Sequence, residues 1–283
     1  MVQSAGHAMN ISHKIIDSTQ EIHHMTDIPY YREVRNEKDV FRAAWQSRRA
    51  VMLKGPTGCG KTRFVEAMAA ELKRPLITVS CNEDLTAADL LGRYLLKGGD
   101  TQWMDGTLTR AVRMGGICYL DEIVEARADT TVAIHALTDH RREMFIDRLG
   151  EQLSAPPEFM MVVSYNPGYQ SILKDLKPST RQRMISIELG FPPADIEIEV
   201  VIKESGVDEA NAQDLVRLAG AIRELDIPGL PEVSSTRTVI AAADLIRAGL
   251  SLKEAVKAGM IGPLCDDPLI DRSLMQLVST YIS

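Results

Sequence analysis

The sequence contains few cysteines and no long hydrophobic run, and both absences exclude classes of protein. No apolar run approaches the roughly 20 residues that a membrane-spanning helix needs. The first residues, MVQSAGHAMNISHK, lack a basic start followed by an apolar core, so we expect no secretory signal and a cytoplasmic protein. The cysteines show no CxxC pair and no metal-ligand spacing, and we expect them to be buried apolar groups rather than disulfides or zinc ligands. They are Cys59, Cys81, Cys118 and Cys265.

Basic residues are not in excess either. The 283 residues include 32 Lys and Arg against 39 Asp and Glu, a formal net charge of −7, whereas a wide nucleic-acid footprint needs a basic surplus. Hydrophobic residues at 45% and charged residues at 25% are ordinary for a soluble globular protein. We therefore expect a folded protein with no nucleic-acid partner and no membrane insertion.

Short apolar runs alternate with helical patterns from about residue 40 to 190, which favours an α/β fold with a parallel sheet covered on both faces. The apolar runs predict five strands, at residues 50–53, 76–80, 117–120, 159–165 and 185–189. Apolar residues at helical spacing predict helices at residues 61–72 and 130–137.

The pattern changes after Phe191-Pro192-Pro193, where only helical spacing follows, at residues 196–204, 210–225, 236–248 and 273–282. We predict three regions: a polar N-terminal tail at 1–26, an α/β core with a central five-stranded parallel sheet at 27–191, and a small all-helical domain at 192–283. The tail is either loose or an arm that binds a partner.

The strongest motif is GPTGCGKT at residues 55–62, which fits the phosphate-loop pattern G-x-x-x-x-G-K-[ST] completely. Its glycines permit a turn whose backbone N–H groups reach phosphate oxygens. Lys61 would contact the β- and γ-phosphates, and the hydroxyl of Thr62 would ligate Mg²⁺. We therefore expect ATP and Mg²⁺ as cofactors. The residues expected to bind ATP are Gly55, Pro56, Thr57, Gly58, Cys59, Gly60, Lys61, Thr62 and Arg63.

Polar side chains end two of the predicted strands. Asp121 and Glu122 end the strand in ICYLDEI, where buried carboxylates are costly unless an ion or hydrogen bonds compensate. Asp121 would hold Mg²⁺ through water, and Glu122 would polarise the water that attacks the γ-phosphate. Asn166, in VVSYNPG, could orient that water or could simply form the turn before Pro167.

Three arginines are further candidate site residues, with ordinary surface exposure as the alternative for each. Arg181 and Arg183 lie in KPSTRQRM, just before the fifth predicted strand. Arg237 lies in SSTRTV, in the first turn of a predicted helix. A cation there opposes the helix dipole, so an anion such as a γ-phosphate would balance it.

In this order and spacing the motifs resemble those of AAA+ ATPases of the MoxR branch, and within it the CbbQ/NirQ/NorQ/GvpN group. The resemblance covers roughly residues 27–250, and it implies the AAA+ fold with a helical lid. It also implies a ring, usually a hexamer, with ATP at subunit boundaries. The stretches that carry it are GPTGCGKTRFVE, ITVSCNEDLTAADLLGRYLL, DGTLTRAVRMGGICYLDEIVEARADTT, HALTDHRR, VVSYNPGYQSILKDLKPSTRQR and SSTRTVIAAADLI.

The resemblance implies a role for each candidate residue. Residues 55–62 correspond to Walker A and residues 121–122 to Walker B. Asn166 corresponds to sensor 1 and Arg237 to sensor 2. Arg183 best matches the arginine finger that reaches the neighbouring subunit's ATP, and Arg181 is the second candidate.

The resemblance also implies two elements that touch partners, an insertion around residues 95–106 and a hairpin around residues 142–153. No aromatic–apolar–glycine pore loop follows the second predicted strand, and Tyr94 is the nearest aromatic residue. This departure favours local remodelling of a client over full unfolding.

Members of this group serve different clients: CbbQ proteins activate inhibited Rubisco, NorQ and NirQ proteins assist maturation of nitric oxide reductase, and GvpN serves gas vesicles. The stretches NEDLTAADLLGRYLLKGGDTQWMDGTLT and KDLKPSTRQR look most like CbbQ, with NorQ close. The resemblance implies a separate adaptor with a von Willebrand factor A domain, because this chain has no DxSxS stretch. The alternatives from other classes are a P-loop small-molecule kinase, a DNA-dependent AAA+ motor and a nucleotide-gated scaffold.

Overall fold

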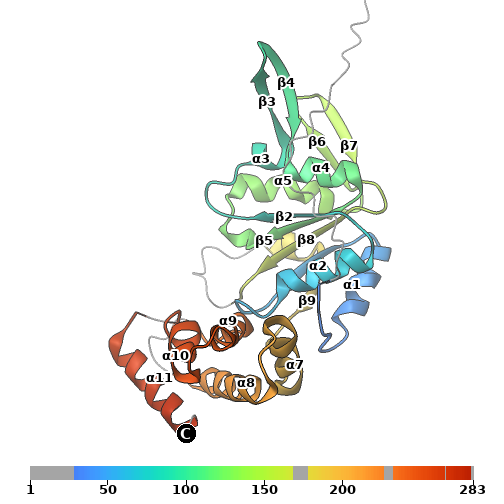
Figure 1. The fold of residues 1–283 in the computed structure, drawn as a ribbon. Coiled ribbons are helices and arrows are strands. Elements are labelled where there is room, and N and C mark those ends of the chain that lie inside the picture. The colour runs from blue at the N-terminus through green and yellow to red at the C-terminus, as the bar shows by residue number, and fades with distance from the viewer. Residues whose placement is uncertain (1–28, 168–177, 226–231, 265, 282–283) are drawn as a thin grey trace, which may run out of the picture.

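A five-stranded parallel sheet forms the centre of the N-terminal part of the chain (Figure 1). The computed structural model describes residues 29–167, 178–225, 232–264 and 266–281. The spatial order of the strands is β2-β5-β8-β1-β9. Their bounds are β1 Ala50–Lys54, β2 Leu76–Ser80, β5 Ile117–Asp121, β8 Met160–Tyr165 and β9 Met184–Glu188.

Helices cover both faces of the sheet, and its three central strands, β5, β8 and β1, are therefore buried along nearly their whole length. One face packs on α1 (Glu37–Gln46) and α2 (Lys61–Glu71), with Phe41, Phe64 and Met68 fully buried between helix and sheet. The other face packs on α3 (Ala87–Leu91), α4 (Thr107–Met114) and α5 (Ala128–Thr138). A short helix, α6 (Pro178–Arg181), precedes β9, and a 3₁₀ turn, η1 (Ile123–Glu125), follows β5.

Two β-hairpins extend from the sheet on the side away from the C-terminal helices (Figure 1). The first pairs β3 (Gly92–Lys97) with β4 (Asp100–Asp105), and the second pairs β6 (Glu143–Ile146) with β7 (Glu151–Ser154). Tyr94 Oη donates to the Arg148 carbonyl at 3.3 Å, which links the hairpins. Arg113 of α4 joins their bases, with Nε 2.8 Å from Asp105 and Nη2 2.7 Å from Glu151.

The C-terminal part is entirely helical among the residues described. Its core contains Val201, Leu215, Leu218, Val239 and Leu274, each fully buried. Gly259 permits a close approach between η3 and α9, since a Cβ there would lie 2.8 Å from the Ala242 backbone nitrogen. The elements are α7 (Ala194–Ser205), α8 (Glu209–Glu224), α9 (Thr236–Arg247), α10 (Leu252–Val256), the π-helical turn η3 (Lys257–Ile261) and α11 (Pro268–Tyr281).

The five predicted strands and the predicted helices are present with small shifts of their ends. The largest shift is in α11, which begins at Pro268 instead of Ser273, because proline is well suited to the first turn of a helix. Apolar spacing alone did not predict α1, α3, α4 and α10, and each of these four helices has ten residues or fewer. The predicted tail at 1–26 and Cys265 lie outside the described residues.

The helices that the structure describes include none that combines the length and the apolar character needed to cross a membrane.

Candidate nucleotide site between the sheet and the C-terminal helices

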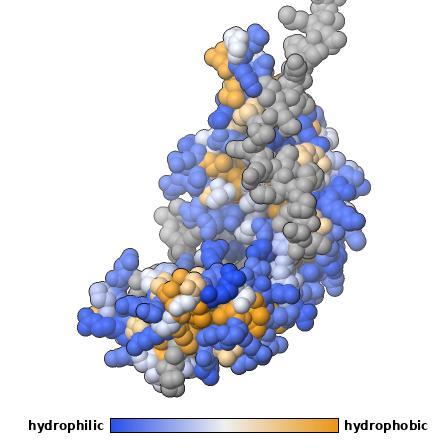
Figure 2. Space-filling model, viewed as in Figure 1, coloured by the Kyte–Doolittle hydropathy of each residue, from blue (hydrophilic) through white to orange (hydrophobic). Residues whose placement is uncertain are grey.

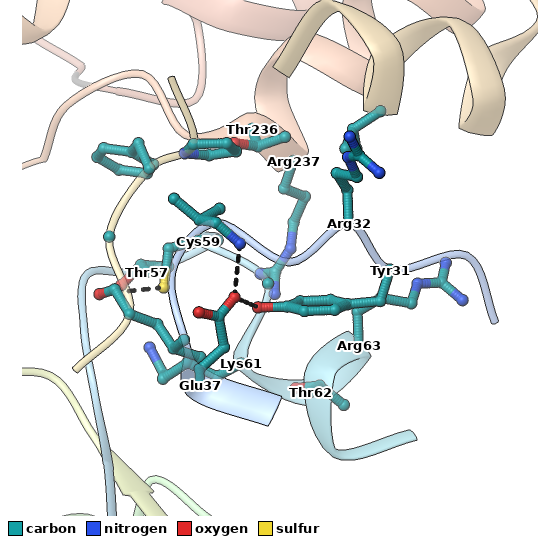
Figure 3. Close-up of a pocket in the computed structure, with 18 of the residues that line it drawn as sticks. Tyr31, Arg32, Glu37, Thr57, Cys59, Lys61, Thr62, Arg63, Thr236 and Arg237 are labelled. Atoms are coloured by element: carbon teal, nitrogen blue, oxygen red, sulfur yellow. Dashed lines mark hydrogen bonds between the residues drawn. The ribbon is translucent and has the colours of Figure 1, made fainter. Parts of the chain in front are cut away.

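A cavity of about 490 Å³ lies where the sheet meets the C-terminal helices. The carboxyl ends of β1, β5 and β8 form its floor, which is where ligands bind in open α/β sheets. The first turn of α9 and the residues just before α7 form the opposite wall (Figure 3). Both parts of the chain therefore contribute to this pocket.

The loop between β1 and α2 has a backbone that only glycine accommodates at three positions. Gly58 and Gly60 have φ of 69° and 96°, in the left-handed region. A Cβ on Gly55 would lie 2.3 Å from the Leu189 carbonyl oxygen, so a side chain there would separate the loop from the end of β9. The GPTGCGKT motif thus forms the tight turn that was predicted, followed by α2 from Lys61.

Lys61 is buried at the centre of this loop, with 8% of its surface exposed. Its Nζ donates to the carbonyls of Gly55 and Pro56, both at 2.9 Å, and to Asn166 Oδ1 at 2.5 Å. Burial lowers the pKa of Lys61 below its ordinary value. The ammonium group is therefore held at the loop by three neutral oxygens, which phosphate oxygens could replace.

The acidic pair at the end of β5 is fixed by hydroxyl groups. Asp121 accepts from Tyr119 Oη at 2.7 Å and from Ser164 Oγ, and Thr62 Oγ1 lies 3.5 Å from its other oxygen. The Glu122 backbone N–H donates to the same Ser164 hydroxyl at 3.1 Å. Ser164, fully buried in β8, therefore bridges the two acidic residues.

Glu122 itself has a left-handed backbone, with φ of 56° and ψ of 48°. Such a conformation is costly for a residue with a side chain, and it persists where the surroundings impose it. Its side chain is exposed and lines the pocket. The strained turn thus directs Glu122 toward the cavity while Asp121 stays within the hydroxyl network.

Asn166 follows β8 and contacts the phosphate loop at two places. Asn166 is 9% exposed, and its side chain accepts from Lys61 and donates through Nδ2 to Thr57 Oγ1 at 3.1 Å. Asn166 therefore lines the pocket beside Lys61, and its expected role in orienting the attacking water stays a prediction.

A segment that the motifs did not predict forms one side of the cavity. Tyr31 lies along this wall, and its hydroxyl donates to Glu37 Oε1 at 2.9 Å (Figure 3). The Glu37 carboxylate also accepts from the backbone N–H groups of Val34 and Arg35, both at 2.8 Å. Burial opposes ionisation of Glu37, but these hydrogen bonds outweigh it and hold its pKa below the usual value. Burial and the Glu37 charge raise the pKa of Tyr31.

The C-terminal helices approach the phosphate loop through the first turn of α9. Arg237 extends from this turn into the pocket (Figure 3). A Cβ on Gly58 would lie 2.6 Å from the Ser235 side chain, so the loop and the helix are in close contact. Two further contacts cross the same boundary: Arg63 Nη2 lies 2.8 Å from Glu204, and Thr57 Oγ1 donates to Glu232 at 3.1 Å.

Arg181 and Arg183 do not line the pocket as the described residues define it. Arg183 is exposed, and its Nη1 donates to the His135 carbonyl of α5 at 3.3 Å. Arg181 ends α6, one turn before β9. The structure therefore brings residues 55–63, Asp121, Glu122, Asn166 and Arg237 together, and it places the other two arginines elsewhere on the same chain.

The residues around the loop fit a nucleoside triphosphate with Mg²⁺. A glycine turn at a helix N-terminus and a buried ammonium group are suited to phosphate. The Thr62 hydroxyl and the Asp121 carboxylate supply the hard oxygen ligands that Mg²⁺ takes alongside phosphate oxygens and water. Among the described residues no group of three or more His, Cys, Asp or Glu could hold a metal ion.

Two protein families match this chain. Residues 50–184 match the family described as an AAA domain of the dynein-related subfamily, and residues 197–281 match the family described as CbbQ/NirQ/NorQ C-terminal. NorQ of Paracoccus denitrificans is 58% identical over 253 residues, which is 89% of this chain and 94% of that protein. The denitrification regulatory protein NirQ of Pseudomonas aeruginosa is 54% identical, covering 90% of this chain and 98% of that protein. CbbQ of Hydrogenophilus thermoluteolus is 52% identical, covering 90% and 96%.

Among solved structures, a point mutant of RuvB from Thermotoga maritima is similar, with a TM-score of 0.52 and 19% identity over 89% of this chain and 72% of that one. At this identity the likeness concerns the fold, and it agrees with the predicted central sheet and helical lid. The family matches span the sheet, the phosphate loop and the C-terminal helices described above. The chain therefore belongs to the CbbQ/NirQ/NorQ group of AAA+ ATPases.

Proposed function

We propose that this ATPase binds Mg²⁺ and ATP in the pocket between sheet and helices and uses hydrolysis to remodel a folded partner enzyme. The observation that carries the proposal is that the phosphate loop, the acidic pair and Arg237 of the helical lid meet in one cavity. Because both parts of the chain line that cavity, loss of the γ-phosphate would change how the lid sits on the sheet.

Each residue at the pocket has a role in this proposal. Lys61 binds the β- and γ-phosphates, and Thr62 and Asp121 hold Mg²⁺, whose charge offsets that of the phosphates. Glu122 takes a proton from the attacking water. Asn166 orients that water, and Arg237 contacts the γ-phosphate from the lid.

We propose further that the chain works as a ring, as a hexamer. Arg183 supports this arrangement, because it is exposed and does not line its own pocket. In a ring its guanidinium would reach the ATP of the neighbouring subunit, where such a residue stabilises charge in the transition state. Arg181 is the second candidate for the same contact.

The β3–β4 hairpin is the element that we propose touches the partner. Leu96 is 81% exposed at its end, beside Tyr94 and Leu95 at 44% and 39%. Figure 2 shows hydrophobic atoms at this end of the molecule, surrounded by hydrophilic ones. An exposed apolar group on a projecting hairpin is costly in water unless a protein surface covers it.

Two clients are candidates, both reached through a separate adaptor with a von Willebrand factor A domain. Inhibited Rubisco is the client expected from the CbbQ-like stretches, and activation would mean release of a tight-binding sugar phosphate. Nitric oxide reductase is the alternative. The relatives support both candidates, since the chain is 58% identical to a NorQ, 54% identical to a NirQ and 52% identical to a CbbQ.

The test uses both clients side by side. In one arm, carboxylation by inhibited Rubisco is followed over time with this protein, its adaptor and ATP. In the other, nitric oxide reductase is produced with its adaptor, with and without this chain, and its specific activity is measured. We expect one client to respond to the wild-type chain and not to Glu122→Gln. No response from either client, with normal ATP hydrolysis, would refute the assignment to these two enzymes.

A surface variant tests the hairpin separately. Leu96→Asp should abolish client activation while ATP hydrolysis in the absence of client stays unchanged, because Leu96 does not line the pocket and β3 lies on the side of the sheet away from the C-terminal helices (Figure 1). Leu269→Asp on α11, where the leucine is 68% exposed, is the matched control and should change neither activity. Full client activation by Leu96→Asp would contradict the role of the hairpin.

A further inference from the structure

A buried ion pair in the helical lid lies directly behind the first turn of α9. Glu197 of α7 is 1% exposed, and its two carboxylate oxygens accept from Arg223 Nη1 and Nη2 of α8, both at 2.7 Å. The same carboxylate accepts from Thr236 Oγ1 at 2.6 Å. Desolvation of two charges offsets much of their attraction, so a buried pair of this kind contributes little net stability.

The other contacts of Arg223 all lead toward the nucleotide pocket. Its Nε donates to the Ser234 carbonyl at 2.7 Å. Its guanidinium carbon lies 4.1 Å from the centre of the Phe191 ring, in cation–π geometry, and Phe191 lines the pocket. Ser234 and Thr236 are the third and first residues before Arg237. The pair thus fixes the backbone on the N-terminal side of Arg237 at two points.

Arg237 depends on this backbone for its direction. Its side chain is exposed, and among the residues that the structure describes it makes no hydrogen bond or ion pair of its own. The position of its Cα in the first turn of α9 therefore sets the direction in which Arg237 extends into the pocket. The same turn is in close contact with the phosphate loop, where Ser235 packs against Gly58.

We infer that Glu197 and Arg223 are positioning residues that hold Arg237 where it can contact the γ-phosphate. The inference rests on the proposed function, because it takes Arg237 as the lid residue that contacts that phosphate. It goes beyond the proposed function by assigning a role to two lid residues that do not line the pocket.

The test compares the affinity for a non-hydrolysable ATP analogue with that for ADP, by calorimetry with Mg²⁺. Glu197→Gln keeps the shape of the side chain and removes its charge. Thr236→Val removes only the hydroxyl link to Glu197, and Thr236→Ser restores it. Asp214→Asn is the control, because it removes an exposed ion pair with Arg217 on α8, away from the pocket. Melting temperatures verify that each variant folds.

We expect Glu197→Gln and Thr236→Val to lower the affinity for the triphosphate about tenfold and to leave ADP affinity nearly unchanged, as for loss of one charge-assisted contact. Thr236→Ser and Asp214→Asn should behave as wild type. In an Arg237→Ala background, Glu197→Gln should add no further loss, since both changes remove the same contact.

Two results would overturn the inference by itself. In the first, Glu197→Gln and Thr236→Val lower the affinities for the ATP analogue and for ADP equally. In the second, their effects on affinity persist in full in the Arg237→Ala background. Each result would mean that the pair has a purely structural role. A different result, an unchanged preference for triphosphate in Arg237→Ala alone, would overturn the role of Arg237 in the proposed function and this inference with it.

Discussion

Ser164→Ala should slow ATP hydrolysis, although the sequence patterns assigned no role to Ser164. The fully buried hydroxyl donates to Asp121 and accepts from the Glu122 N–H at 3.1 Å. Its removal takes one hydrogen bond from a carboxylate and leaves a backbone donor unpaired, at a cost of roughly 2 kcal/mol in stability. Without that bridge the left-handed turn at Glu122 would relax, and a shift of about 1 Å can lower the rate by 10²-fold.

The assay measures kcat and the KM for ATP, with the melting temperature as a check on folding. We expect kcat to fall by about 10²-fold and KM to change little, because the phosphate loop is untouched. Ser164→Thr, which keeps the hydroxyl, should recover most of the rate. Ser186→Ala, at an exposed serine on the edge strand β9, is the matched control. Unchanged kcat in a folded Ser164→Ala protein would refute the bridging role.

Three further changes test other parts of the site. Lys61→Ala should abolish tight ATP binding in calorimetry, because the buried ammonium is the cation at the phosphates; unchanged affinity would contradict the assignment. Because burial lowers the Lys61 pKa, the protonated fraction falls at lower pH than for an ordinary lysine of pKa 10.5. ATP affinity should therefore decline as pH rises toward that value, and an affinity that stays flat through the alkaline range would argue against it. Arg183→Ala should preserve ATP binding but lower kcat by about 10³-fold. Mixed with Glu122→Gln subunits it should regain activity, and absence of rescue despite subunit exchange would direct attention to Arg181.

Much of the fold and the chemistry of the pocket could be predicted from local patterns. The phosphate loop is a contiguous motif, and the strands that position it are short apolar runs between helical stretches. The acidic pair was recognisable because carboxylates at the end of a buried strand cost desolvation energy unless an ion or hydrogen bonds compensate. The two family matches support an AAA+ ATPase rather than a small-molecule kinase.

The rest depends on contacts between residues distant in sequence. Ser164 resembles any small strand residue until the register of β8 against β5, with Val163 opposite Leu120, places it beside Asp121. Glu197 and Arg223 are both ordinary helix residues, and only the packing of α7 on α8 makes them a buried pair. Tyr31 and Glu37 meet through a turn that no periodic pattern encodes. The β3–β4 hairpin, by contrast, had a local signal in Gly98-Gly99, which supplies the positive φ of a two-residue turn.

The central claim is that the acidic pair at the end of β5 hydrolyses ATP in the pocket shared by sheet and lid. The most direct measurement is ATP binding and ATP turnover by Glu122→Gln in one preparation. We predict that ATP affinity is retained, because Lys61 and the loop are intact, and that turnover falls by about 10²-fold or more through loss of the general base. Turnover near the wild-type rate would contradict the claim, since another group would then activate the water.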